Sequence, residues 1–217
     1  DPYFELARTM PLAWGMSLGF GEFTNYVKEQ LEKGDTLEIA GFDSQLFSLN
    51  FKNDFEEVQS LISTSEVLRP LQKQSLLESI NLLKQRSKAN QKILKKKDIG
   101  ADIASISLLI NEFPTSFETQ CLKSLKSTLS DWYLKKSYLR DRQMADNLIW
   151  LKQQYPDKKI LCWGATSHFL FNSDKVHLKG FPYNIVDNSY QKDQMMGDYL
   201  RDQYGDKVYS IGFSAIE

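Results

Sequence analysis

The chain has 217 residues, of which 41% are hydrophobic and 25% are charged, a composition that is typical of a globular domain and excludes a disordered segment. Its 27 basic and 28 acidic residues nearly cancel, so the charge indicates neither a nucleic-acid partner nor a membrane-surface partner. No apolar run approaches the roughly 18 residues that a membrane-spanning helix needs.

The first 51 residues predict a helical region followed by a strand. Residues 3–33 have helical character with interruptions, and their last apolar side chains recur at helical spacing. Gly34 is a typical residue for the C-terminal stop of such a helix. Residues 36–42 (TLEIAGF) alternate and then turn apolar, which predicts a strand that ends at Asp43.

Residues 52–155 differ in composition from the rest of the chain. They contain almost no glycine and are rich in leucine, lysine, glutamine, glutamate and serine. Apolar residues recur at i, i+4 and i+7, as in 76–83, which predicts consecutive helices broken near Pro70, Gly100 and Pro114. A connection of this length is too long for a plain loop, so we expect an all-helical insertion or cap.

The last part of the chain predicts alternating helices and strands. Residues 137–155 form an amphipathic pattern that ends before Pro156, and the apolar stretch 158–163 follows as a short strand. Residues 193–206 predict another helix, and 207–214 predict a last strand.

Apolar strands that alternate with helices indicate an α/β fold. We therefore predict a mostly parallel sheet flanked by helices, built from residues 1–51 and 136–217. Residues 52–135 are then the helical insertion that packs on this core.

Polar side chains follow the three predicted strands, where the ligands of open α/β sheets bind. Asp43 ends the first strand, His168 lies just past the second and Ser214 follows the third. We expect His168 to act as a general base, oriented by Asp43 if the two strands are neighbours. The alternatives are that His168 packs against Trp163 and Phe169, and that Asp43 caps a loop.

The helix before the second strand carries further candidates. Arg140 and Asn147 are seven residues apart and share a helix face with Met144 between them, so they suit a pocket wall that binds an anionic or carbonyl oxygen. A surface position is the alternative for Arg140. Arg142 and Asp146 have the i, i+4 spacing of a surface ion pair.

Other kinds of site are not expected from the spacing. The two histidines, His168 and His177, have no partner at metal-ligand spacing, and the two cysteines, Cys121 and Cys162, form no paired motif. The G-x-S-x-G pattern of a serine nucleophile does not occur. We expect no metal and no cofactor.

Four motifs occur in a characteristic order along the chain. They are "IAGFDSQ", then "RDRQMADNLIWL", then "KILCWGATSHFLFN", then "MGDYLRDQYGDKVYSIGF". They resemble a G-[FY]-D segment, an R-[DE]-x-x-M-A-x-N helix, a strand ending W-A-H-N-x-H, and a helix opening M-G-x-x-L before a strand ending G-F. In this order they resemble the C-terminal half of the erythromycin esterase-like family, and the resemblance covers essentially the whole chain.

The resemblance implies an α/β fold whose members include hydrolases that open macrolide lactones, in which a histidine activates water for attack on the ester carbonyl. Two departures stand beside it. The positions of the family's first histidine and of its asparagine are Ala165 and Thr166 here. The family's N-terminal strand and loop, with a His-Gly pair, have no counterpart, so we expect the chain to hold only part of the site. The matching positions are Asp43, Arg140, Met144, Asn147, Trp163, His168, Met196 and Gly197.

We therefore predict a hydrolase domain that acts on an ester or related acyl bond of a small molecule. His168 is the expected base or carbonyl contact, and Asp43 is its expected orienting partner. The expected substrate-binding residues are Arg140, Asn147, Trp163, Thr166, Met196 and Gly197. One alternative is a non-catalytic binding protein that keeps the family scaffold, and another is an enzyme of polysaccharide metabolism.

Overall fold

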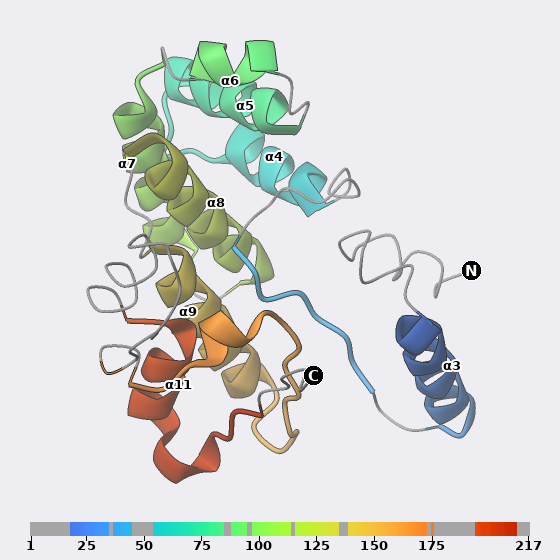
Figure 1. Cartoon of the computed structure of the whole chain (residues 1–217). Helices are drawn as coiled ribbons and strands as arrows, with labels where there is room; N and C mark the ends of the chain where they lie inside the picture. The colour runs from blue at the N-terminus through green and yellow to red at the C-terminus, as the bar shows by residue number, and fades with distance from the viewer. Residues whose placement is uncertain are drawn as a thin grey trace. The chain divides into compact units, whose positions relative to one another are not determined.

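Helices make up the regular secondary structure of the described part of the chain (Figure 1). The computed structural model describes residues 18–34, 37–44, 54–84, 88–94, 97–113, 116–134, 139–172, 175 and 194–211. The α-helices are α3 (Leu18–Glu32), α4 (Asp54–Thr64), α5 (Pro70–Lys84), α6 (Lys88–Leu94), α7 (Ile99–Glu112), α8 (Phe117–Leu134), α9 (Leu139–Gln154) and α11 (Met196–Tyr204). Two short 3-10 helices are η1 (Thr166–Phe169) and η3 (Gly205–Lys207).

The prediction of an α/β fold with a parallel sheet is wrong for these residues. Within the described ranges no strand forms, and residues 37–43, 159–163 and 208–211 run without regular secondary structure. The physical reason is that a strand is defined by the backbone partner it pairs with, and alternating apolar residues supply no partner. The regular secondary structure of the described residues is entirely helical.

The chain divides into two units. Unit 1 comprises Asp1–Gly41 and Gln45–Leu122, and unit 2 comprises Phe42–Ser44 and Lys123–Glu217. The division expected from the sequence, a core of 1–51 and 136–217 with 52–135 inserted, stays a prediction.

In unit 1, the predicted helical spacing identifies the buried face of α5. Leu76, Ile80 and Leu83 are buried, and α5 packs against α4, α6 and α7. Pro70 is the first residue of α5, where proline is well tolerated because its missing N–H needs no partner. The break predicted near Gly100 is at Asp98, whose side chain accepts a hydrogen bond from Ala101 N–H at 3.0 Å. The predicted break at Pro114 lies outside the described residues.

A buried carboxylate joins α5 to α7. The hydroxyl of Ser75 donates to Asp102 Oδ1 at 2.7 Å, and the hydroxyl of Ser79 donates to Asp102 Oδ2 at 2.5 Å. Asp102 and Ser79 are both buried. The two hydrogen bonds compensate for removing the charge of Asp102 from water.

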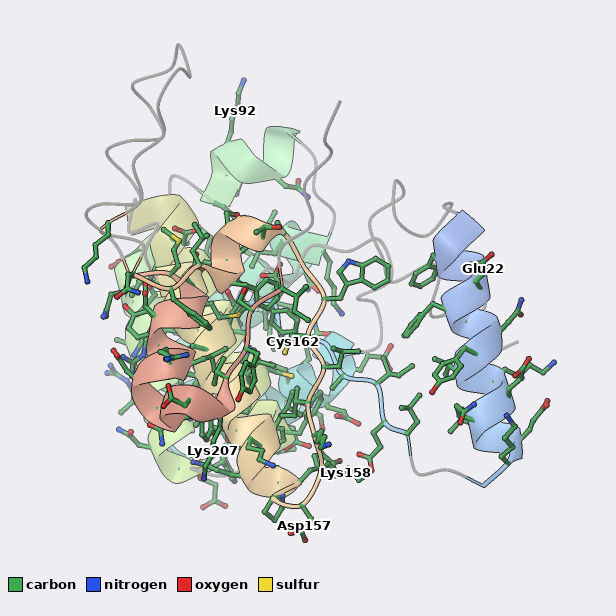
Figure 2. All side chains as sticks on the ribbon, turned by 60° about the horizontal axis from the view of Figure 1, so that its bottom comes forward. Glu22, Lys92, Asp157, Lys158, Cys162 and Lys207 are labelled. Atoms are coloured by element: carbon green, nitrogen blue, oxygen red, sulfur yellow. The ribbon has the colours of Figure 1, made fainter. Side chains whose placement is uncertain are left out.

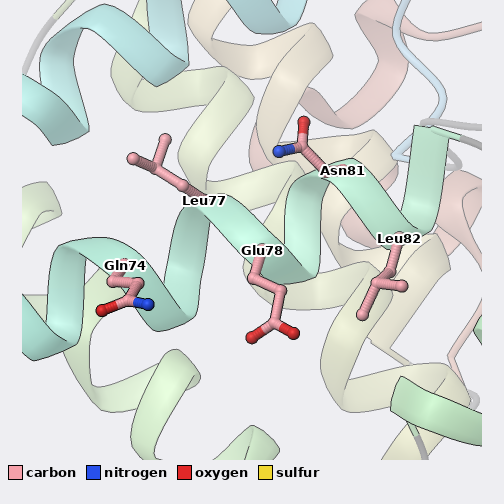
Figure 3. Close-up of a pocket in the computed structure, with 5 residues that line it drawn as sticks. All are labelled: Gln74, Leu77, Glu78, Asn81 and Leu82. Carbon is pink, nitrogen blue, oxygen red and sulfur yellow. The ribbon is translucent and has the colours of Figure 1, made fainter.

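The outer face of α5 carries a surface groove of about 510 Å³ (Figure 3). Its lining residues all come from this one helix, so it is an open hollow rather than an enclosed site. The lining residues are Gln74, Leu77, Glu78, Asn81 and Leu82.

In unit 2, α9 and α11 lie against each other and form one core (Figure 1). Three segments that the sequence predicts as strands each place an apolar side chain against this core, namely Phe42, Cys162 and Val208. Each of these segments therefore contributes one apolar side chain to the core, although its backbone is not in a sheet. The buried residues of the core are Met144, Ala145, Leu148, Met196 and Leu200.

The same segments leave other apolar side chains in water. Leu161 is 93% exposed, Tyr209 is 85% exposed and Ile211 is 79% exposed. In the ranges that the structure describes, none of the helices is both long and apolar enough to cross a membrane.

Candidate active site

His168 lies on the single turn of η1, which follows the apolar segment 159–163. Its backbone N–H donates to the carbonyl oxygen of Ala165 at 3.1 Å, which closes the turn. The side chain is 22% exposed, so water reaches the imidazole. The histidine therefore sits at the boundary between the core of unit 2 and solvent.

The carboxylate that contacts His168 is Asp141, in the first turn of α9. His168 Nδ1 lies 2.8 Å from Asp141 Oδ1, and the backbone N–H of Met196 donates to the same oxygen at 3.0 Å. The Asp141 side chain is 12% exposed. An ionised carboxylate can only accept hydrogen bonds, so a hydrogen bond in this contact requires the tautomer that carries its proton on Nδ1.

Sequence reasoning missed Asp141, although a signal for it exists. Asp141, Met144, Ala145 and Leu148 follow the i, i+3, i+4, i+7 pattern of a helix face that packs inward. Acidic side chains are rarely buried unless they are paired, so an acidic residue on such a face indicates a partner. All four residues are buried in α9.

Asp43 contacts Arg140 rather than His168. Arg140 Nε donates to Asp43 Oδ1 at 3.1 Å and Nη2 donates to Oδ2 at 2.7 Å, which is a bidentate pair. Burial alone would lower the pKa of Arg140, but the hydrogen bonds to Asp43 and the charges of Asp43, Asp141 and Asp131 outweigh it and raise the pKa. Burial raises the pKa of the nearby Asp131, with Arg140 opposing and Asp141 adding to the shift.

Asn147 holds the segment that carries Asp43. Its Nδ2 group donates to the carbonyl oxygen of Phe42 at 3.0 Å and to Ser124 Oγ at 3.1 Å, and its Oδ1 accepts from Gln143 Nε2 at 2.9 Å. The hydroxyl of Thr128 donates to the carbonyl oxygen of Ser44 at 2.6 Å, which anchors the same segment from α8. The side-chain amide of Asn147 thus positions the backbone of the segment that carries Asp43.

Four further candidates have contrasting environments. Thr166 is exposed at the start of η1, and Trp163 is also exposed. Met196 is fully buried in the core. A Cβ on Gly197 would lie 2.4 Å from the carbonyl oxygen of Leu170, so glycine is needed where α11 meets the end of η1. The structure places Met196 and Gly197 beside His168 and Asp141, which together form the His168 pair.

Comparisons with known proteins identify the family of this chain. The family model described as "Erythromycin esterase" matches residues 19–217. This chain belongs to the erythromycin esterase family. A Bacillus subtilis (strain 168) protein named "Putative hydrolase YbfO" is 26% identical over 227 residues, which cover 89% of this chain and 48% of that protein. The chain thus spans about half the length of this relative. No solved structure matches this chain.

Membership of the erythromycin esterase family confirms the resemblance drawn from the motifs. The roles of the individual site residues stay predictions. Ser214 and His177 lie outside the described residues. The predicted ion pair is confirmed, since Arg142 Nε lies 3.1 Å from Asp146 Oδ1.

Among the described residues of this erythromycin esterase family member, neither Cys162 nor a cluster of metal ligands forms a second candidate site. Cys162 lies among the packed side chains of unit 2 (Figure 2), and burial raises the pKa of its thiol to about 11. The thiolate is therefore scarce at neutral pH. Among the described residues, histidine, cysteine and acidic side chains form no group of three that could hold a metal ion.

A small hollow of about 280 Å³ lies where the residues after η1 meet α11. Its charged side chains already have partners: Asp198 accepts from the backbone N–H of Asn172 at 2.6 Å, and Arg201 donates to Asp206 at 2.6 Å. The His168 pair is therefore the better candidate for chemistry.

Proposed function

We propose that this chain supplies a general base, His168, to an ester hydrolase that acts on an ester or related acyl bond of a small molecule. The observation that carries the proposal is the 2.8 Å contact between His168 Nδ1 and the carboxylate of Asp141. With the proton held on Nδ1, the Nε2 lone pair is the ring position that can accept a proton from water. Family membership and the hydrolase name of the Bacillus subtilis relative support the same class of reaction.

In the proposed reaction, a water molecule gives a proton to His168 Nε2 while its oxygen bonds to the acyl carbon. The electrons of the carbonyl π bond move to its oxygen, which becomes an oxyanion. The oxyanion then collapses, the bond to the leaving alcohol breaks, and the proton passes from Nε2 to the alkoxide oxygen. The products are a carboxylic acid, which ionises in water, and an alcohol, and the histidine returns to its neutral form.

We assign Arg140 to the stabilisation of the oxyanion. In α9, Arg140 directly precedes Asp141, the residue that contacts His168. Asp43 holds the guanidinium of Arg140 in one orientation through two hydrogen bonds. A positive charge fixed before the reaction begins needs no reorganisation as the negative charge develops. The role of Asp43 in this proposal is to orient Arg140.

The test measures hydrolysis of simple acyl esters and macrolactones by the protein at its natural length. We expect His168→Ala to lower kcat/KM by about 10²–10⁴-fold, the usual contribution of a general base. His177→Ala is the matched control, because it removes the other histidine of the chain. Equal losses in the two variants, or turnover that His168→Ala leaves unchanged, would overturn the proposal.

A further inference from the structure

We propose that Asp141 is the positioning residue of this site, holding the ring of His168 and the first turn of α11 with a single carboxylate oxygen. The inference rests on the proposed function, since it assigns how the base is kept in a productive orientation. Asp141 acts through His168 and does not itself contact substrate. The two contacts to Asp141 Oδ1 are the 2.8 Å contact from His168 Nδ1 and the 3.0 Å hydrogen bond from Met196 N–H.

The charge and burial of Asp141 make these contacts strong. Hydrogen bonds to an ionised acceptor are roughly twice as strong as those between neutral groups. With its side chain 12% exposed, Asp141 is screened less by water than a surface carboxylate. The nearby Asp43 is occupied with Arg140, which leaves Asp141 as the acid that sets the tautomer of His168.

The second contact is with a helix end that needs a partner. Met196 is the first residue of α11, and the first N–H groups of a helix have no acceptor within the helix. Asp141 supplies an acceptor for the N–H of Met196, whose side chain is fully buried in the core. The carboxylate therefore ties α9 to α11 at the point where His168 is held.

The close approach at Gly197 completes this arrangement. A Cβ on Gly197 would lie 2.7 Å from the carbonyl carbon of Phe169, the residue after His168. The backbones of η1 and α11 are thus in direct contact, with no side chain between them. Asp141 and Gly197 together fix His168 relative to both helices.

The first test uses ¹⁵N-labelled histidine, because the chain has two histidines and each ring gives separate nitrogen signals. The signals that disappear in His168→Gln belong to His168. At a pH where the ring is neutral, we expect the unsubstituted protein to show a protonated Nδ1 and a bare Nε2. In Asp141→Ala the preference for a protonated Nδ1 should be lost.

Asp146→Asn is the matched control, because Asp146 lies on the same helix and pairs with exposed Arg142. It should leave the His168 signals unchanged. Asp141→Leu keeps a side chain of similar size without a hydrogen-bond acceptor and serves if Asp141→Ala does not fold, with the same expected loss of the tautomer preference. A bare Nδ1 in the unsubstituted protein, or a tautomer unaffected by both Asp141 variants, would overturn the inference.

The second test is kinetic. We expect Asp141→Ala to lower kcat about a hundredfold with little change in KM, since the base is misplaced while substrate binding is retained. In a His168→Ala background the same substitution should cause almost no further loss. A purely structural role for Asp141 would instead lower turnover in both backgrounds.

The two proposals fail in distinguishable ways. If no ester is hydrolysed but Asp141→Ala changes the His168 tautomer, the ester-hydrolase proposal fails and the positioning role stands. If His168→Ala removes turnover while Asp141→Ala changes neither the tautomer nor kcat, His168 remains the base and the positioning role is overturned.

Discussion

Gly197 shows how a residue without a side chain controls the surroundings of His168. A Cβ at this position would lie 2.4 Å from the carbonyl oxygen of Leu170 and 2.8 Å from that of Phe169. Both neighbours are backbone atoms, which cannot rotate away as a side chain can. We expect Gly197→Ala to destabilise the protein by about 1–3 kcal/mol and to lower its melting temperature, as measured by circular dichroism.

The matched control for this substitution is Gly19→Ala. Gly19 is the second residue of α3, as Gly197 is of α11, and a Cβ there would meet nothing within 4 Å. Because alanine favours a helix over glycine, the control should be neutral or slightly stabilising. Equal melting temperatures for the two variants would contradict the close backbone contact.

Asp131 is expected to make stability depend on pH. Burial raises its pKa from the ordinary value of 3.8, so the folded state binds its proton more tightly than the unfolded state. The stability from this group is present below pH 3.8 and is lost as the pH rises through the raised pKa. We expect Asp131→Asn to raise the melting temperature at pH 7 and to have no effect below pH 3.8.

The measurement is the melting temperature of the unsubstituted protein and of Asp131→Asn, from below pH 3.8 up to pH 7. A variant that is less stable at pH 7 would show that the charge of Asp131 is favourable, through its attraction to Arg140. Asp157→Asn is a suitable control, because Asp157 is an exposed residue in the turn after α9.

The sequence indicates His168 as a candidate but does not identify its partner. Asp43 and Asp141 both lie close to a predicted helix or strand end, and residue spacing does not measure the distance between side chains from different segments. The structure separates them, since Asp43 binds Arg140 and Asp141 contacts His168. A pair of this kind follows from the packing of α9 against η1 and α11, which sequence periodicity does not describe.

At the scale of helices, the buried carboxylate of Asp102 is a sensitive point of the α5–α7 contact. Ser79→Ala removes one hydrogen bond to this charge while both residues stay buried. Because a hydrogen bond to a charged group contributes about 1.5–3 kcal/mol, we expect the free energy of unfolding in urea to fall by that amount.

Ser107→Ala provides the comparison for this variant. The hydroxyl of Ser107 donates to the carbonyl oxygen of Ile103 within α7 at 2.8 Å, so its loss leaves no buried charge without a partner. We expect a change within about 0.5 kcal/mol. If Ser79→Ala is as mild as Ser107→Ala, Asp102 does not depend on the serine hydroxyls.

Helices were predictable from the sequence and strands were not, for a common reason. The hydrogen bonds of a helix are local, so the spacing of Leu76, Ile80 and Leu83 is enough to place α5 and its buried face. A strand needs a partner that is distant in sequence, so the apolar residues around Phe42 and Cys162 predicted strands although the sequence does not specify a partner for them.

At the scale of the whole molecule, the order of the motifs identified the family more reliably than the fold. The family model matches residues 19–217, although identity to the Bacillus subtilis relative is 26%. Motifs are short and keep their order when the residues between them change. The fold that the resemblance implied was wrong for the described residues, which are helical.

The exposed apolar side chains of unit 2 affect how stability varies with temperature. Leu161, Tyr209 and Ile211 already lie in water in the folded protein, so unfolding adds little to their hydration. The heat-capacity change of unfolding scales with the surface that unfolding newly exposes, and so does the slope of the unfolding free energy against denaturant concentration. These segments therefore flatten the curve of free energy against temperature, and the protein loses less of its stability on cooling than one whose apolar residues are all enclosed.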